Sequence, residues 1–332
     1  MEKEVTKIEN GDKVRDSFGR EINYLRVSLT DRCNLRCKYC MPKGGIENKL
    51  EHKDTLNLEE IYHIIEELAG LGISKIRFTG GEPLVRRGIV DLISMTKKIP
   101  GIKEIAMTTN ALLLKKYAKE LKEAGLDRVN ISLDTLNRDK YKEITRGGSL
   151  EKVLEGIEIA KEVGLTPIKI NTVLIGGFND SEIEDFINLT IYDDIDVRFI
   201  ELMPIGEAQD FSEDNFISND LIIERNPELI QVIKADKASP ANYYKHPDAK
   251  GKIGIINPIS CKFCSNCNRI RLTSTGKLKL CLHSNREIDL RSPIRNGDNI
   301  RDLLIDSILS KEKEHKLEDK EYISRNMNQI GG

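Results

Sequence analysis

Short β-rich runs alternate with amphipathic helical patterns along the first two thirds of the chain, and this alternation constrains the fold most. The runs lie at residues 24–30, 75–79, 104–109, 128–133, 168–175 and 196–202. Helical patterns lie at 57–70, 112–124, 150–163 and 181–191, the first with Asn57 and Glu60 placed as a capping box. Strands that alternate with helices form parallel sheets with right-handed crossovers. The sequence therefore predicts an α/β fold.

One face of the predicted strands repeatedly carries polar side chains. Alternate residues of a strand point to the same side, and the polar set is Arg26, Ser28, Lys75, Arg77, Thr79, Asn130, Ser132, Asp134, Lys169, Asn171 and Arg198. The opposite face is apolar and suits packing under helices. Six βα units are too few for a closed eight-unit barrel, so we expect an incomplete (βα)6 TIM-like barrel with a charged interior. The alternative is that these charges only fill the interior as ion pairs, because buried charges need partners.

The βα rhythm ends after Met203. A short helix at 221–225, strands at 252–256 and 268–273, and a charged terminal helix from 299 are the remaining patterns. We therefore expect a barrel at residues 1–205 and a C-terminal α+β extension at 206–332 that need not fold alone.

Composition and charge limit the partners. The chain has 332 residues and a formal net charge of -2, which gives no overall reason to bind nucleic acid or an anionic membrane. Its first residues are charged, and no apolar run reaches the ~18 residues of a membrane span. We expect a cytoplasmic protein in which any anionic ligand is held by a local cluster of Lys and Arg.

All seven cysteines lie in two groups. An odd number without an export signal argues against a disulfide framework. In the first group, CNLRCKYC, thiolates at Cys33, Cys37 and Cys40 suit an iron–sulfur cluster or zinc. Three ligands would leave the fourth iron of a four-iron cluster open to a small molecule. Zinc would usually take a fourth Cys or His, and the nearest is His52.

The CxxxCxxC motif, preceded by LRVSLTDR and followed after the second strand by FTGGEPL, resembles the signature of the radical S-adenosylmethionine (SAM) enzymes. The resemblance implies that the three cysteines hold a four-iron cluster whose free iron binds SAM and reduces its sulfonium, which releases a 5′-deoxyadenosyl radical. It also implies cofactor contacts for the GGEP motif and for three more positions. The residues concerned are Tyr39, Gly80, Gly81, Glu82, Ser132 and Met203.

The second group, CKFCSNC, is followed by Cys281, with 13 residues between Cys267 and Cys281. Zinc is the generic interpretation of such spacing, but three well-spaced ligands also suit a second cluster with an open iron. Arg269 and Arg271 are separated by one residue, so on a strand both guanidinium groups face the same way and could bind a phosphate together.

From about Gly19 to the last residue the chain resembles the MoaA family, the GTP 3′,8-cyclases of molybdenum cofactor biosynthesis. The most specific segments are YLRVSLTDRCNLRCKYCMP, RFTGGEPLVRR, RFIELMP, FCSNCNRIRLT and the terminal IGG. The resemblance implies that Cys264, Cys267 and Cys281 bind a second four-iron cluster whose free iron holds the guanine of GTP. The positions expected to contact GTP, chiefly its triphosphate, are Arg26, Arg77, Thr108, Lys169, Arg269 and Arg271. Terminal Gly331 and Gly332 are expected to reach into the active site.

The activity implied is conversion of GTP to 3′,8-cyclo-7,8-dihydro-GTP. The deoxyadenosyl radical removes the ribose 3′ hydrogen, the sugar radical adds to guanine C8, and one more electron completes the product. The resemblance further implies an external electron donor, transfer of the product to a cyclic pyranopterin monophosphate synthase, and a homodimer.

Two positions depart from the family pattern. Cys261 offers an alternative thiol beside Cys264, and we expect it to be a spare. Ala111 follows Asn110 where the family commonly has glycine.

Two other functions compete with the cyclase. The first is a twin-cluster radical SAM enzyme that acts on a peptide or tetrapyrrole. The second is a non-catalytic metal-binding module for nucleotides or RNA, although a chain without tryptophan and with 5% aromatic residues offers little stacking surface.

Overall fold

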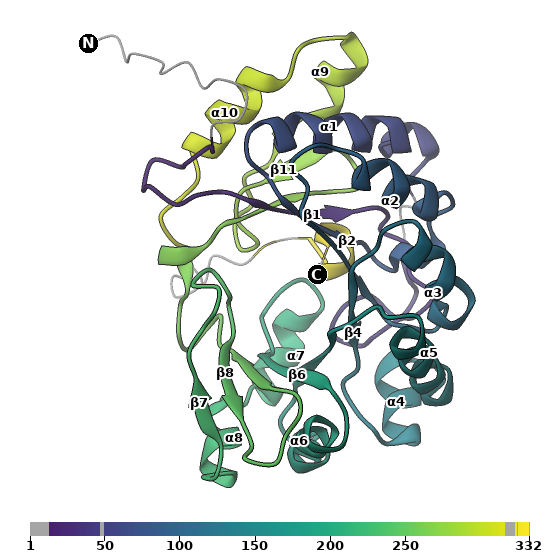
Figure 1. Ribbon diagram of the computed structural model, residues 1–332, viewed down its shortest axis with the longest axis vertical. Coiled ribbons are helices and arrows are strands. Elements are labelled where there is room, and N and C mark those ends of the chain that lie inside the picture. Colours follow the sequence, from purple (N-terminus) through teal and green to yellow (C-terminus); the bar gives the residue numbers. More distant parts are fainter. Residues whose placement is uncertain (1–12, 47–49, 316–322, 324, 332) are drawn as a thin grey trace.

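The computed structural model describes residues 13–46, 50–315, 323 and 325–331. Six parallel strands, neighbours in chain order, form the centre of its sheet (Figure 1). They are β1 (Tyr24–Ser28), β2 (Lys75–Thr79), β3 (Glu104–Thr109), β4 (Arg128–Ser132), β5 (Ile168–Leu174) and β6 (Ile195–Glu201). All six predicted strands are present, and the expected partial barrel is confirmed.

Helices cover the outer face of these strands (Figure 1). They are α1 (Leu58–Gly70), α2 (Ile89–Lys97), α3 (Leu114–Glu123), α4 (Arg138–Thr145), α5 (Leu150–Glu162) and α6 (Ile183–Tyr192). The capping box of Asn57 and Glu60 starts α1 as predicted. Outward strand residues such as Val27, Phe78 and Phe199 are fully buried in one core with the apolar stripes of the helices. Across the described ranges, no helix combines the length and apolar character needed to cross a membrane.

The chain after residue 205 adds strands to both edges of the six-stranded sheet. β10 (Arg269–Leu272) pairs in parallel with β1, and β9 (Ile253–Ile256) pairs in parallel with β6. The outer strands are β7 (Ile230–Val232), β8 (Asn242–Lys245), β11 (Lys277–Lys279) and β12 (Ile288–Asp289). Because the extension shares the sheet of the barrel, its strands extend the wall around the interior at both edges. The boundary at residue 205 stays a prediction.

The remaining helices are short. They are α7 (Ala208–Asn215), α8 (Asp220–Arg225), α9 (Arg291–Asn296), α10 (Arg301–Leu309) and α11 (Met327–Ile330). Four 3₁₀ turns lie at η1 (His52–Asp54), η2 (Pro83–Val85), η3 (Asp180–Glu182) and η4 (Cys264–Asn266). The sequence indicated α8, α10, β9 and β10, whereas α2, α4, α7 and the other extension strands were not expected.

Candidate active site

Strand register places three arginines side by side inside the barrel. Arg271 of β10 lies opposite Arg26 of β1, which lies opposite Arg77 of β2. Neighbouring strands are about 4.8 Å apart, so the three guanidinium groups share one region. Burial, with neighbouring guanidinium groups, lowers the pKa of Arg26 and Arg77 to about 9 and that of Arg271 to about 10. Within the described residues no carboxylate pairs with Arg77 or Arg271, so this arginine row favours binding of an anion.

A second row lies two residues earlier on the same strands, and it consists of Arg269, Tyr24 and Lys75. The Tyr24 ring lies 5.3 Å from the Arg77 guanidinium carbon and 6.0 Å from that of Arg269. Tyr24 therefore separates positive charges that would otherwise repel each other directly.

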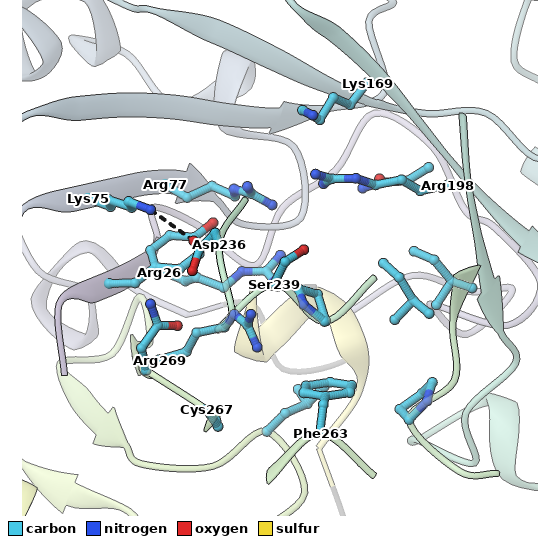
Figure 2. A pocket seen from close by; sticks show the side chains of 18 of the residues that line it. Arg26, Lys75, Arg77, Lys169, Arg198, Asp236, Ser239, Phe263, Cys267 and Arg269 are labelled. Carbon is cyan, nitrogen blue, oxygen red and sulfur yellow. Dashed lines mark hydrogen bonds and ion pairs between the residues drawn. The ribbon is translucent and has the colours of Figure 1, made fainter. Parts of the chain in front are cut away.

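Segment 233–240, between β7 and β8, holds the two cations of this second row. The Lys75 ammonium lies 3.0 Å from an Asp236 carboxylate oxygen, and Arg269 donates to the Ala238 carbonyl. Figure 2 shows Asp236 beside Lys75 at the edge of the cavity. The outer part of the positive site is thus held partly by contacts within the protein.

The two rows line a cavity of about 520 Å³, a size typical of small-molecule sites. Lys169 of β5 and Arg198 of β6 face it from the other wall (Figure 2). Lys169 pairs with Asp196, and Arg198 donates to the Tyr243 hydroxyl at 2.6 Å. Internal ion pairs, the alternative explanation of the polar strand face, therefore account for part of the polar interior. They do not account for the arginine row.

Five of the six predicted GTP contacts line the cavity, namely Arg26, Arg77, Lys169, Arg269 and Arg271. Thr108 of β3 is not part of this wall, and its hydroxyl is buried without a hydrogen-bond partner. The wall also contains Lys75, Arg198, Tyr243 and Asp236, which were not predicted as site residues. Strand alternation already placed Lys75 and Arg198 on the polar face, whereas no sequence signal marked Tyr243 or Asp236.

The second cysteine group lies at the amino end of β10, beyond the arginine rows. Cys264, Cys267 and Cys281 all line the cavity, whereas Cys261 is exposed and lies outside the wall. The backbone N–H groups of His315, Arg269 and His283 act to lower the pKa of Cys264, Cys267 and Cys281, respectively, and so favour the thiolates. Three thiols in this setting suit a thiolate-bound centre.

The first cysteine group lies at the opposite end, in the loop that follows β1. The end of α4 fixes this loop: Arg36 N–H donates to Thr145 O at 3.1 Å, and Lys38 N–H to Ile144 O at 2.9 Å. Arg146, in a left-handed conformation with φ of 55°, donates to Met41 O at 2.9 Å. These hydrogen bonds define the backbone of the loop.

The three thiols of this loop are brought together at an electrostatic cost. Burial, followed by a neighbouring thiol, raises the pKa of Cys40 to about 12 and that of Cys37 well above its usual range. Burial likewise raises the pKa of Cys33 to about 11. A positively charged metal centre would offset this cost by binding the thiolates.

The GGEP motif packs against the backbone of the same loop. A Cβ atom at Gly81 would lie 2.4 Å from Arg32 O, and one at Gly80, with φ of 157°, would lie 2.7 Å from Thr30 O. Only glycine permits this close approach.

The Glu82 carboxylate is hydrogen-bonded to other groups of the protein. It accepts hydrogen bonds from the Thr109 hydroxyl at 2.7 Å, Asn110 N–H at 2.8 Å and Leu84 N–H at 3.1 Å. Burial raises the pKa of Glu82 to about 7. Its carboxylate therefore joins the ends of β2 and β3, and any contact of GGEP with SAM falls to the backbone of the motif.

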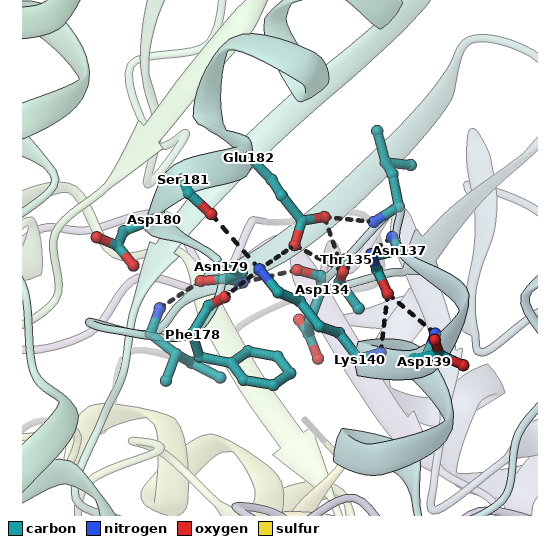
Figure 3. A network of polar contacts seen from close by, with 12 residues as sticks. Asp134, Thr135, Asn137, Asp139, Lys140, Phe178, Asn179, Asp180, Ser181 and Glu182 are labelled. Atoms are coloured by element: carbon teal, nitrogen blue, oxygen red, sulfur yellow. Dashed lines mark hydrogen bonds and ion pairs between the residues drawn. The ribbon is translucent and has the colours of Figure 1, made fainter.

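A polar network at the ends of β4 and β5 positions Tyr39. The Tyr39 hydroxyl donates to Asp134 at 2.7 Å, and the other Asp134 oxygen accepts Val173 N–H at 2.9 Å. Glu182, which accepts from Thr135 and Lys140, extends the network (Figure 3). The two other predicted cofactor contacts take no part in these hydrogen bonds. Ser132 ends β4 and is half-buried, and Met203 lines the cavity.

The C-terminal segment lies between the two ends of the site. Gly331 has φ of 72°, and its carbonyl accepts a 2.5 Å hydrogen bond from Arg271. The Asn328 side-chain amide donates to Asp31 O at 2.9 Å, in the loop that carries the first cysteine group. The tail thus connects the arginine row to the first cysteine loop. Gly332 lies outside the described residues.

Both cysteine groups suit iron–sulfur clusters. Thiolates are the soft donors that such clusters take. In a four-iron cluster each of three thiolates would bind a different iron, which leaves the fourth iron without a cysteine ligand.

Comparisons with known proteins agree with the fold and the two cysteine groups. The radical SAM superfamily model matches residues 27–190, and the model described as Molybdenum Cofactor Synthesis C matches residues 195–317. SuiB of Streptococcus suis, whose structure is solved, aligns with a TM-score of 0.58 over 88% of this chain and 68% of its own, at 14% identity. The fold and site thus define a radical SAM protein with a molybdenum cofactor synthesis extension.

Full-length relatives refine this assignment. A GTP 3′,8-cyclase of Peptoclostridium acidaminophilum is 60% identical over 98% of this chain and 100% of its own. Those of Alkaliphilus oremlandii and Pelotomaculum thermopropionicum are 58% and 47% identical over 96% of this chain and 100% of their own. The chain belongs to the GTP 3′,8-cyclase (MoaA) family.

Proposed function

We propose that this enzyme is a radical SAM GTP 3′,8-cyclase that converts GTP to 3′,8-cyclo-7,8-dihydro-GTP in molybdenum cofactor biosynthesis. The observation that carries the proposal is the arginine row between two groups of three cysteines. The negative charges of a triphosphate would pair with the guanidinium groups of the arginine row. The family assignment indicates that the nucleotide is GTP. Neither a peptide nor a tetrapyrrole substrate is indicated by the relatives, and an RNA-binding module has no need of two cysteine groups.

The first cysteine group, Cys33, Cys37 and Cys40, would hold one four-iron cluster. With SAM bound, the cluster held by these cysteines would supply the one-electron chemistry that removes the ribose 3′ hydrogen of GTP. Tyr39, the GGEP backbone, Ser132 and Met203 would contact SAM. The closeness of GGEP to the cysteine loop supports this arrangement.

Cys264, Cys267 and Cys281 would hold the second cluster and, with it, the guanine. Arg26, Arg77, Lys169, Arg269 and Arg271 would bind the triphosphate through charge-assisted hydrogen bonds. Thr108 could join them only if its buried hydroxyl moved towards the cavity. Gly331 and Gly332, at the end of the C-terminal tail, would reach into the active site. Enclosure of the cavity would exclude water and protect a radical from quenching.

An anaerobic assay tests this function. The chain, reconstituted with iron and sulfide, is mixed with SAM, a strong reductant and GTP, and mass spectrometry measures 5′-deoxyadenosine and a cyclised isomer of GTP. We expect both products to form together. Deoxyadenosine without change in GTP would retain the radical chemistry and reject the substrate, and absence of both from a fully loaded chain would reject the enzyme.

The seventh cysteine provides a matched control. Cys33→Ala should abolish both products, Cys267→Ala should abolish GTP cyclisation and lower bound iron by half, and Cys261→Ala should change neither. Equal iron loss in Cys261→Ala and Cys267→Ala would reject the proposed second ligand set.

The proposed partners follow from the same assignment. An external donor supplies electrons, a cyclic pyranopterin monophosphate synthase receives the product, and the protein acts in the cytoplasm as a homodimer. Family resemblance supports these points, and sedimentation of the cluster-loaded chain tests the dimer.

A further inference from the structure

A buried lysine lies among the three cysteines of the second group. Lys311 follows α10 and is 3% exposed. Its ammonium donates to Arg269 O at 3.1 Å and to Leu280 O. Across the described residues, no carboxylate lies within ion-pair distance of Lys311. An ammonium has three donors, so the described residues leave one N–H and the positive charge without a partner.

Two hydrogen bonds place the Lys311 ammonium beside the second cysteine group. The two carbonyls that hold the ammonium belong to Arg269, two residues after Cys267, and Leu280, the neighbour of Cys281. Lys311 is therefore fixed to the backbone that carries two of the three proposed ligands.

An isolated buried ammonium is costly, because removal of a charge from water requires a partner of opposite sign. A four-iron cluster with three thiolate ligands carries net negative charge and would be such a partner. Net charge and hydrogen bonds around a cluster set its reduction potential.

We propose that Lys311 is the electrostatic partner of the second cluster, and that its charge retains the cluster and raises its reduction potential. This inference rests on the proposed second cluster and extends it to a residue outside the cysteine motif. Lys311 is a positioning residue that acts through the cluster, because a positive charge stabilises the more negative, reduced state.

The test is a redox titration of the cluster-loaded holoenzyme followed by electron paramagnetic resonance, with iron counted per chain. In Lys311→Gln the side-chain amide can still donate to the carbonyls but carries no charge. We expect its second cluster to reduce at least tenfold less readily, a shift of 59 mV for one electron, to more negative potential. Lys311→Arg should restore the potential, because it keeps the charge. The first cluster serves as the reference within each molecule.

Lys140→Gln is the matched control. Lys140 also donates to a backbone carbonyl, that of Phe178 at 2.6 Å, but it pairs with Glu182 in the network of Figure 3. Lys140→Gln should leave the reduction potential of the second cluster unchanged. Loss of the second cluster alone in Lys311→Gln, with retention in Lys311→Arg, would support the same role.

Two results would overturn the inference, and they are distinguishable. A wild-type chain that binds a single cluster would reject the proposed second cluster and the inference with it. Two clusters in Lys311→Gln, with the second potential equal to that of wild type, would reject the role of Lys311 alone.

Discussion

Arg271 of β10 donates a 2.5 Å hydrogen bond to the carbonyl oxygen of Gly331, 60 residues later in the chain. The bond joins the arginine row to the C-terminal tail. At the same place a Cβ atom on Gly331 would lie 2.4 Å from the Thr79 hydroxyl. The tail therefore fits between β1, β2 and β10 only because residue 331 lacks a side chain.

Gly331→Ala should displace the tail and lower GTP cyclisation at least tenfold while both clusters remain bound. The reason is the contact with Thr79, added to the roughly 1–2 kcal/mol that a left-handed backbone costs a residue with a Cβ. Mass spectrometry of the product and an iron count measure the two effects.

Gly177→Ala is the control for backbone strain. Gly177 has φ of 71°, almost the same as Gly331, but nothing lies within 4 Å of its hypothetical Cβ. It should lose similar stability and keep full activity. Equal losses of activity in both variants would show that the tail has no special role.

The alternation of polar residues along the strands predicted the arginine rows well. Inward and outward positions follow from the pleat, and the parallel register then brings Arg26, Arg77 and Arg271 together. Asp236 and Tyr243 were not predicted, because they lie on or beside β7 and β8, which are strands of three and four residues. Such short strands carry too few residues for a period of two to be visible.

The local turn at Ala111 shows a second limit of the sequence. Ala111 replaces the family glycine, and the structure holds it at φ of 62° and fully buried. The turn survives the substitution because the Ala111 N–H bonds to Thr109 Oγ1 at 3.0 Å and the methyl packs in the core. A sequence shows the departure but not the contacts that make it tolerable.

Arg77→Met should raise the thermal stability of the nucleotide-free protein and weaken GTP binding about 10- to 100-fold. Arg77 is 8% exposed and is held by the Tyr24 ring rather than a carboxylate, so its removal relieves an uncompensated charge. The lost affinity corresponds to about 1.5–3 kcal/mol for a charge-assisted hydrogen bond. Calorimetry and thermal unfolding under anaerobic conditions measure both.

Arg128→Met provides the contrast, because Arg128 pairs with Glu104. Its removal leaves that carboxylate without its partner and should destabilise the protein. If Arg77→Met also destabilised the nucleotide-free chain, Arg77 would have a structural role that the contacts do not show.

Asp236→Asn should strengthen GTP binding about two- to fivefold at low ionic strength. Its carboxylate holds Lys75 at the cavity edge and repels a triphosphate, but both side chains are partly exposed, and such pairs contribute about 0–1 kcal/mol. Salt should reduce the gain, because it screens exposed charges. Isothermal titration at two ionic strengths checks this.

Asp289→Asn is the surface control for Asp236→Asn. Asp289 pairs with Lys277 at 3.3 Å with similar exposure, away from the cavity wall. It should leave GTP affinity unchanged. Weaker binding in Asp236→Asn would mean that segment 233–240 helps to hold the nucleotide.

The pH dependence of stability should report the burial of Glu82. Its pKa is about 7 in the folded chain against an ordinary value of 4.5, so the folded state binds the Glu82 proton more tightly than the unfolded state does. The contribution of Glu82 to stability is therefore greatest below pH 4.5 and is lost as pH rises to about 7. The full loss is about 3 kcal/mol, at about 1.4 kcal/mol for each pH unit. Glu82→Gln has no such titration. We therefore expect the melting temperature of the variant to rise relative to that of wild type as pH rises. Thermal unfolding measured anaerobically from pH 5 to 8 checks this. A difference that stays constant over this range would mean that Glu82 keeps an ordinary pKa and that its three hydrogen-bond donors fully offset its burial.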